Sequence, residues 1–142
     1  MMDGKMAISD VSSDDFSLHD AEIVSISMDR GTSVCRIGLF HVTGQCRTVE
    51  LIGVKAFRAE DFVLQNVVSR MLRSTAKQFS TEVIEYWMTW ATSFSDTGSW
   101  LKPDSKHHWL AGLNEGKLEL VVFEPSIGAQ IAVVCERLLL RP

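Results

Sequence analysis

The sequence predicts an α+β fold: an antiparallel meander sheet of about six or seven strands, with one long aromatic-striped helix at about residues 81–95 packed on one face. Two patterns support this prediction. Apolar and polar residues alternate with a period of two near both ends of the folded region, which is typical of strands with one buried face. Between these two alternating regions, large apolar residues, mostly aromatic, recur at steps of three and four, which is the spacing of one helical face.

The domain organisation follows from length and charge. The chain is predicted to form a single domain over residues 17–142, preceded by a flexible acidic lead-in over residues 1–16. The first 22 residues carry six acids against one lysine, whereas the other 120 residues carry 12 acids and 13 bases. The folded part therefore lacks the basic field that drives nucleic-acid binding, and no nucleic acid is expected as a partner.

The cysteines and the N-terminus indicate the compartment. Three cysteines without CxxC spacing, and a polar start in place of a signal-peptide pattern, predict a cytoplasmic protein with free thiols. Cys35 and Cys135 fall in alternating apolar segments and are predicted to be core residues. A membrane span is not expected because no run of about 18 apolar residues occurs. No cofactor signature is found either, so no cofactor is expected.

The register of the first three predicted strands can be argued from the apolar pattern. A two-residue loop at Gly31-Thr32 places apolar residues opposite one another, and a three-residue loop at 43–45 does the same for the third strand. A slip of one residue would turn every side chain to the other face. The predicted core face consists of Val24, Ile26, Met28, Cys35, Ile37, Leu39, Val49 and Leu51.

The rest of the chain continues the pattern. Residues 66–73 fit either a strand or the start of a helix, and a strand is favoured. Ser80 is a candidate N-cap for the helix that follows. Trp87 and Trp90 on this helix are candidate ligand-facing aromatics, although packing against the sheet is the favoured interpretation. The helical stripe consists of Phe79, Val83, Trp87, Trp90 and Phe94.

Extending the predicted register outward gathers polar residues at one end of the core face. Glu22 would lie opposite His41, and His41 opposite Arg47, with Asp20 on the same side. A carboxylate beside an imidazole orients the ring and favours its protonated form, as general bases and pH switches require. A polar rim that closes the sheet is the favoured interpretation. A functional site at Asp20, Glu22, His41 and Arg47 is the alternative.

The other histidines are not expected to bind a metal. Strand parity would point His19 and Asp20 to opposite faces, so that the adjacent pair could not act together. His107 and His108 are predicted to be exposed in a loop. Zinc sites need three or four ligands, usually with separated spacing, and this sequence offers no such set. No metal site and no catalytic residue are therefore predicted.

The first half of the sequence resembles a known group of proteins. The segments LHDAEIVSISMD, CRIGLF and VELIGVKAF, separated by turns, are similar to the opening meander of small uncharacterised bacterial domains. Some of these are immunity-type proteins that accompany polymorphic toxins. The resemblance covers about residues 17–57 and does not include the aromatic helix. It implies a non-enzymatic bacterial protein that acts through a protein partner, and it implies no particular functional residue.

The sequence therefore favours a non-enzymatic, cytoplasmic protein-binding domain, with an immunity-type inhibitor as the form that the resemblance implies. The acidic N-terminal segment would suit a basic partner. The alternative is a small-molecule binder or enzyme that uses Glu22, His41 and Arg47 at one end of the sheet. A purely structural subunit and a homo-oligomer are left open.

Overall fold

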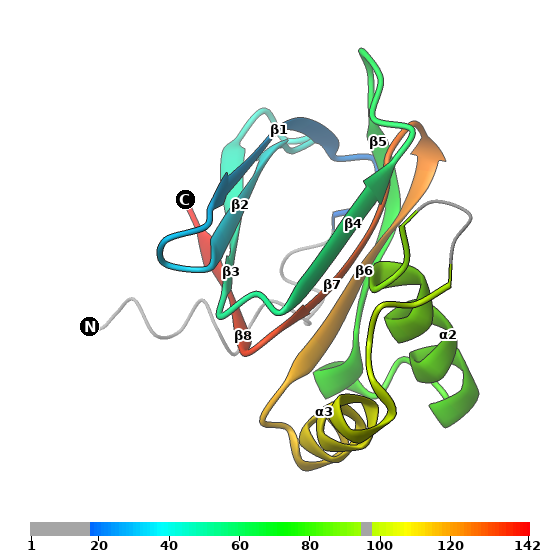
Figure 1. The fold of residues 1–142 in the computed structure, drawn as a ribbon. Helices are drawn as coiled ribbons and strands as arrows, with labels where there is room; N and C mark the ends of the chain where they lie inside the picture. Colours follow the sequence, from blue (N-terminus) through cyan, green and yellow to red (C-terminus); the bar gives the residue numbers. More distant parts are fainter. Residues whose placement is uncertain (1–17, 95–97) are drawn as a thin grey trace.

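The structure is a computed structural model, which describes residues 18–94 and 98–142 (Figure 1). The described residues confirm the α+β class, with eight strands where six or seven were predicted and two α-helices where one was predicted. The elements are β1 (Glu22–Asp29), β2 (Val34–Phe40), β3 (Cys46–Ile52), β4 (Ala56–Glu60), β5 (Val67–Arg73), a 3-10 turn (Ser74–Ala76), α2 (Thr81–Ala91), α3 (Pro103–Glu115), β6 (Glu119–Ile127), β7 (Gln130–Cys135) and β8 (Arg137–Arg141).

The eight strands form one antiparallel sheet that closes on itself. Its order is β4-β7-β6-β5-β1-β2-β3-β8. β3 runs on into β4 through residues 53–55, and β7 runs on into β8 through Glu136 alone. β3 pairs with β8, and β4 pairs with β7. The bent segment β3–β4 therefore pairs with the bent segment β7–β8 along most of its length, and this pairing joins the two ends of the strand order. Figure 1 shows the resulting curled sheet.

The two faces of the closed sheet have separate apolar cores. Along β6, Val121 and Phe123 point inward, whereas Leu120 and Val122 point outward, and all four are fully buried. The inner core fills the curled sheet, and the outer core lies under the helices. β7 is apolar on both faces and lies between β4 and β6, as expected of a strand inside a sheet that is covered on both sides.

The predicted register of the first hairpin is correct only in part. Met28 lies opposite Cys35 and Ile26 opposite Ile37, as expected. A bulge between Ile23 and Ser25 then changes the parity, because one extra residue on β1 has no opposite partner. Ile23 rather than Val24 faces Leu39, so Ile23 is 2% exposed and Val24 57% exposed. Met28, also predicted to be core, is 40% exposed.

The second hairpin has a longer loop than predicted. β2 and β3 end their pairing at Phe40 and Cys46, so residues 41–45 form the connection. Ile37 therefore lies opposite Val49, not Leu51. The error amounts to two residues, and a shift of two keeps every side chain on the same face. The predicted core residues of these strands are thus all buried: Cys35, Ile37, Leu39, Val49 and Leu51.

The strand prediction at residues 66–73 is confirmed, and the helix prediction is correct in part. The Ser80 side chain accepts a hydrogen bond from Val83 N at 3.3 Å, as an N-cap does. α2 ends at Ala91 rather than near residue 95. Its buried side is formed by Trp87, Met88 and Ala91, whereas two members of the predicted stripe, at positions 83 and 94, are 40% and 67% exposed.

The prediction of a single helix is wrong, because α3 occupies residues predicted to be a polar loop. Its boundaries carry the usual signals: Pro103 opens the helix, Asp104 lies in its first turn, and Gly116 ends it with φ of 76°. α2 contacts β7, β4 and β6, and α3 contacts β6, so both helices cover the outer side of the sheet (Figure 1). Among the described residues, neither helix is long and apolar enough to cross a membrane.

One ion pair lies inside the closed sheet. Arg73 is opposite Val121 and Glu119 is opposite Cys135, and both of these neighbours belong to the inner core. Arg73 Nη2 donates to Glu119 Oε1 at 2.9 Å, and Arg73 Nε donates to Glu119 Oε2. Thr75 Oγ1 also donates to Glu119 Oε2 at 2.8 Å. The pair is 7% and 2% exposed, so its charges are satisfied by each other and by this hydroxyl rather than by water.

The thiols provide a test of the closed core. Cys35 and Cys135 are buried, as predicted, and Cys46 is exposed. Burial raises the pKa of the Cys35 thiol from 9.0 to about 11 and also raises the pKa of Cys135. At pH 8 we expect iodoacetamide to modify Cys46 rapidly and the other two only when the protein unfolds, because the buried thiols are both shielded and less ionised. Mass spectrometry of peptides after timed labelling measures this; equal rates at all three thiols in the native protein would contradict it.

Candidate functional site

The four residues of the predicted polar cluster do not meet as the register predicted. Glu22 lies opposite Phe40 on β2, not opposite His41, because of the bulge in β1. His41 lies in the β2–β3 connection, where its backbone N donates to Gln45 O at 2.8 Å. Its ring Nδ1 accepts from Thr43 N at 3.2 Å and lies 2.9 Å from Thr43 Oγ1. The imidazole is therefore engaged within its own loop.

Arg47 lies on the other face of the sheet from Glu22. It is opposite Leu39, which points into the core, whereas Glu22 is opposite Phe40, the next residue along β2. Successive residues of a strand point to opposite faces, so the two charged side chains diverge. Arg47 Nη2 donates to Gln45 Oε1 at 3.0 Å. The register thus gives no support to a general-base site built from Glu22, His41 and Arg47.

The prediction that His19 and Asp20 point apart is wrong. β1 begins only at Glu22, and Asp20 lies in a turn with φ of 66°, where strand parity does not apply. His19 Nε2 lies 3.5 Å from Asp20 Oδ2, and His19 Nδ1 donates to Ser69 O at 2.8 Å. Both side chains are largely exposed. The His19 ring therefore connects the turn before β1 to β5, and Asp20 lies beside this ring.

The two candidate aromatics differ in their surroundings: Trp87 is packed in the outer core, whereas Trp90 lines a hollow of about 440 Å³ together with Arg58 and Tyr86. Trp87 is 9% exposed, and its ring packs edge-to-face on Tyr86 and Trp90, with centroid distances of 5.1 and 5.5 Å. The Arg58 guanidinium lies 4.4 Å from the centroid of Trp90 and donates to its carbonyl oxygen at 3.0 Å. Trp87 thus belongs to the outer core, and one face of Trp90 is covered by a cation.

The adjacent histidines lie on α3, not in a loop. His108 Nδ1 donates to Asp104 O one turn earlier at 2.8 Å, within the same helix. Among residues 18–94 and 98–142, no group of three or more His, Cys, Asp or Glu side chains could hold a metal ion.

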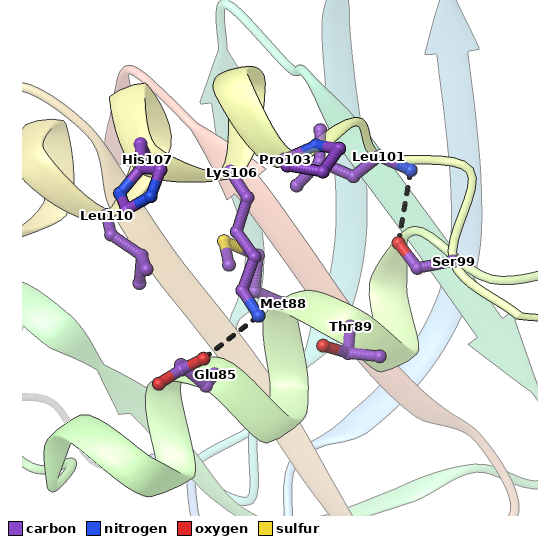
Figure 2. Close-up of a pocket in the computed structure, with 9 residues that line it drawn as sticks. All are labelled: Glu85, Met88, Thr89, Ser99, Leu101, Pro103, Lys106, His107 and Leu110. Carbon is purple, nitrogen blue, oxygen red and sulfur yellow. Dashed lines mark hydrogen bonds and ion pairs between the residues drawn. The ribbon is translucent and has the colours of Figure 1, made fainter.

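A hollow of about 620 Å³ lies between α2 and α3 (Figure 2). Met88 and Leu110 contribute apolar walls, and His107 lies beside Leu110 on α3. Lys106 extends from α3 across the hollow, and its Nζ lies 3.0 Å from Glu85 Oε2 on α2. Glu85 and Lys106 therefore neutralise each other, and the remaining lining combines apolar side chains with the polar residues Thr89, Ser99 and His107.

A group of exposed apolar side chains projects beyond the strands. The connection between β4 and β5 extends past the sheet at the top of Figure 1. Within it, Phe62 is 49% exposed, Val63 51% and Leu64 102%, and Ile127 at the end of β6 is 50% exposed. A methyl group built on Gly128 would lie 3.0 Å from a Val63 methyl, so the β6–β7 turn touches this connection. We refer to Phe62, Val63, Leu64 and Ile127 as the apolar tip.

Asn66 braces the apolar tip from beneath. Its side chain is 1% exposed; Oδ1 accepts from Val63 N at 2.9 Å and from Ala129 N at 3.1 Å, and Nδ2 donates to Val63 O at 2.7 Å. Gly128 has φ of 80°, and a Cβ there would lie 2.3 Å from Asn66 Oδ1. Only glycine fits this turn without displacing the brace. The tip is therefore a loop held in one shape by buried hydrogen bonds.

Two acidic residues lie close to the apolar tip along the backbone. Asp61 immediately precedes it, and Glu22 pairs with Val67, the residue that follows Asn66. The described chain starts nearby, since Asp20 N donates to Val68 O at 2.8 Å, and the sequence before Leu18 contains four aspartates and one lysine.

Sequence reasoning missed the apolar tip, although one signal was present. Phe62, Val63 and Leu64 form an apolar run between the polar residues Asp61 and Gln65. The sequence reveals the run itself, whereas its position on an exposed connection between two strands is visible only in the fold.

Comparison of the chain with protein-family models, with curated proteins and with solved structures finds no match in any of the three. Function is therefore inferred from the geometry of the chain itself.

Proposed function

We propose that this chain is a non-enzymatic protein-binding domain and that the apolar tip is its contact surface. The observation that carries the proposal is the exposure of three consecutive large apolar side chains on a braced loop, with Leu64 entirely outside the fold. Burial of apolar surface against a partner gains about 25 cal/mol per Å². A loop already held in its binding shape pays less ordering entropy on association.

The partner has an apolar groove bordered by lysine and arginine side chains. Asp61 and Glu22 lie beside the apolar tip, and the acidic N-terminal segment joins the fold in the same region. Complementary charge around an apolar contact speeds the encounter and disfavours wrong partners. A basic rim around an apolar groove is therefore the surface that fits this end of the molecule.

An immunity-type inhibitor is the specific form of this proposal. It rests on the resemblance of residues 17–57 to domains that accompany polymorphic toxins, and the partner would then be a toxin domain. Inhibition would act by occupying the partner's surface, which needs no catalytic group on this chain. The braced, exposed tip suits such a stoichiometric block.

The partner can be identified by placing a photo-crosslinking amino acid at position 64 in the native host. Tyr86 is the matched control position, since it is 60% exposed but lies on α2. We expect one discrete crosslinked protein from position 64 that is absent from position 86. A crosslink only to a second copy of this chain would contradict the proposal and would show self-association instead.

The double substitution Phe62→Ser and Leu64→Ser should weaken binding of the purified crosslinked partner by about tenfold or more, because truncating central apolar contacts removes most of the binding energy. Its melting temperature should stay close to that of the wild type, since both side chains are already largely exposed. Isothermal titration calorimetry measures the affinity. Unchanged affinity, with Tyr86→Ser as the control, would show that the tip is not the contact surface.

A further inference from the structure

A second hollow, of about 640 Å³, lies at the other end of β4 from the apolar tip. The turn between β1 and β2, the β3–β4 corner and the chain before α3 all contribute to it. Figure 1 shows this corner in the view between the β1–β2 turn and the segment that leads to α3. The corner is fixed by backbone hydrogen bonds, from Val54 N to Ser33 O at 2.9 Å and from Lys55 N to Val134 O at 2.8 Å.

The walls of this hollow are apolar and partly open to water. Met28 is 40% exposed and Trp100 is 43% exposed, and Phe57 lies partly buried beside them. The Trp100 ring packs edge-to-face on Trp109 at 6.2 Å, and Trp100 N donates to Thr92 O at 2.8 Å. The indole is thus held in place while part of it remains available for contact. A volume of this size falls within the range of small-molecule sites.

Two exposed cations, Arg30 and Lys55, line the same hollow. Among the described residues, neither Arg30 nor Lys55 forms an ion pair. Two acids nearby have contacts of their own: Asp29 Oδ1 accepts from Gly31 N at 3.0 Å, and the Glu136 side chain lies against Gly53. Neither acid lines the hollow.

We propose that this hollow binds an amphipathic small-molecule anion, with an aliphatic or aromatic body on Met28, Phe57 and Trp100 and a carboxylate, sulfonate or phosphate between Arg30 and Lys55. The guanidinium offers two parallel N–H donors to such an oxyanion, and the ammonium adds a second charge. A simple inorganic anion would leave the apolar walls uncovered, and a neutral apolar molecule would leave both cations unpaired. The combination of walls and charges therefore selects a ligand with both properties.

Decanoate is a suitable probe, with decanol as its neutral counterpart and acetate as its short counterpart. We expect saturable binding of decanoate in isothermal titration calorimetry, with decanol and acetate each weaker by about tenfold or more, since each lacks one half of the recognition. Equal affinity for decanoate and decanol would overturn the proposal, because the cations would then contribute nothing. The absence of saturable decanoate binding would overturn it as well.

Variants of the chain locate the site. Arg30→Gln with Lys55→Gln should weaken decanoate binding by about tenfold, and Trp100→Ser should do so independently. A double variant with the same change in charge, Lys77→Gln with Lys117→Gln, should bind as the wild type does, because neither residue lines the hollow. The single variant Lys55→Gln, at an exposed position, keeps the test valid if another variant fails to fold. Equal weakening in the charge control would refute this location, and the tip variant Phe62→Ser/Leu64→Ser should retain decanoate binding.

Discussion

Replacing Arg73 with methionine should lower the free energy of unfolding by about 3–5 kcal/mol, because it leaves the Glu119 carboxylate without its cation inside the closed sheet. Thr75 would remain as a donor, but one neutral hydroxyl cannot replace a bidentate guanidinium. The measurement is urea denaturation at pH 7, with unfolding monitored by tryptophan fluorescence. The double variant Arg73→Met/Glu119→Leu should regain most of the loss, since it removes both charges together.

An exposed pair on the same two strands serves as the control. Arg70 and Glu124 also bridge β5 and β6, but their side chains are 63% and 31% exposed. Arg70→Met should therefore cost less than about 1 kcal/mol, because water solvates the remaining carboxylate. Similar losses for Arg70→Met and Arg73→Met would contradict the buried position of the Arg73–Glu119 pair.

Replacing Phe123 with alanine should destabilise the protein by about 3–5 kcal/mol. Its side chain is 0% exposed and lies in the inner core, where a truncated residue leaves a cavity that the closed sheet cannot readily collapse. The same substitution at Phe62, which is 49% exposed, removes little buried surface and should change stability by less than about 0.5 kcal/mol. Chemical denaturation of both variants measures the free energy of unfolding after the same truncation at a buried position and at an exposed position.

Comparable losses in the two phenylalanine variants would contradict the assignment of Phe62 to the surface. It would mean that the β4–β5 connection packs against the fold and is not available to a partner. This comparison therefore tests the fold and the premise of the apolar tip in one experiment.

The sequence predicted which face of a strand is buried better than it predicted strand pairing. Val49 and Leu51 were assigned to the core correctly although their opposite residues were wrong, since an error of two residues preserves parity. Val24 was assigned wrongly because a bulge adds one residue to one strand only. Alternation of apolar residues does not reveal a bulge when apolar residues stand at two successive positions, as Ile23 and Val24 do.

The predicted pairing of Glu22 with His41 is wrong for the same reason. The cluster depended on two inferred registers: the first holds from Met28 to Ser25 and is then shifted by the bulge, and the second differs by two residues because the loop is longer. A displacement of one residue exchanged His41 for Phe40 as the neighbour of Glu22. α3 was missed because its sequence has few apolar residues, so its periodicity is weak, although Pro103 and Gly116 marked both ends.

The strand pairing determines where another chain could add a strand to this sheet. Strand addition needs a long row of unpaired backbone amides and carbonyls at a sheet edge. β4 and β8 stand at the ends of the strand order, and each has only five residues. β1 has eight residues and pairs with β2 as far as Asp29, but its ladder with β5 consists of the single pair Glu22–Val67. Among the described residues, the outer side of β1 after Ile23 is therefore the longest stretch of strand backbone to which a partner strand could add.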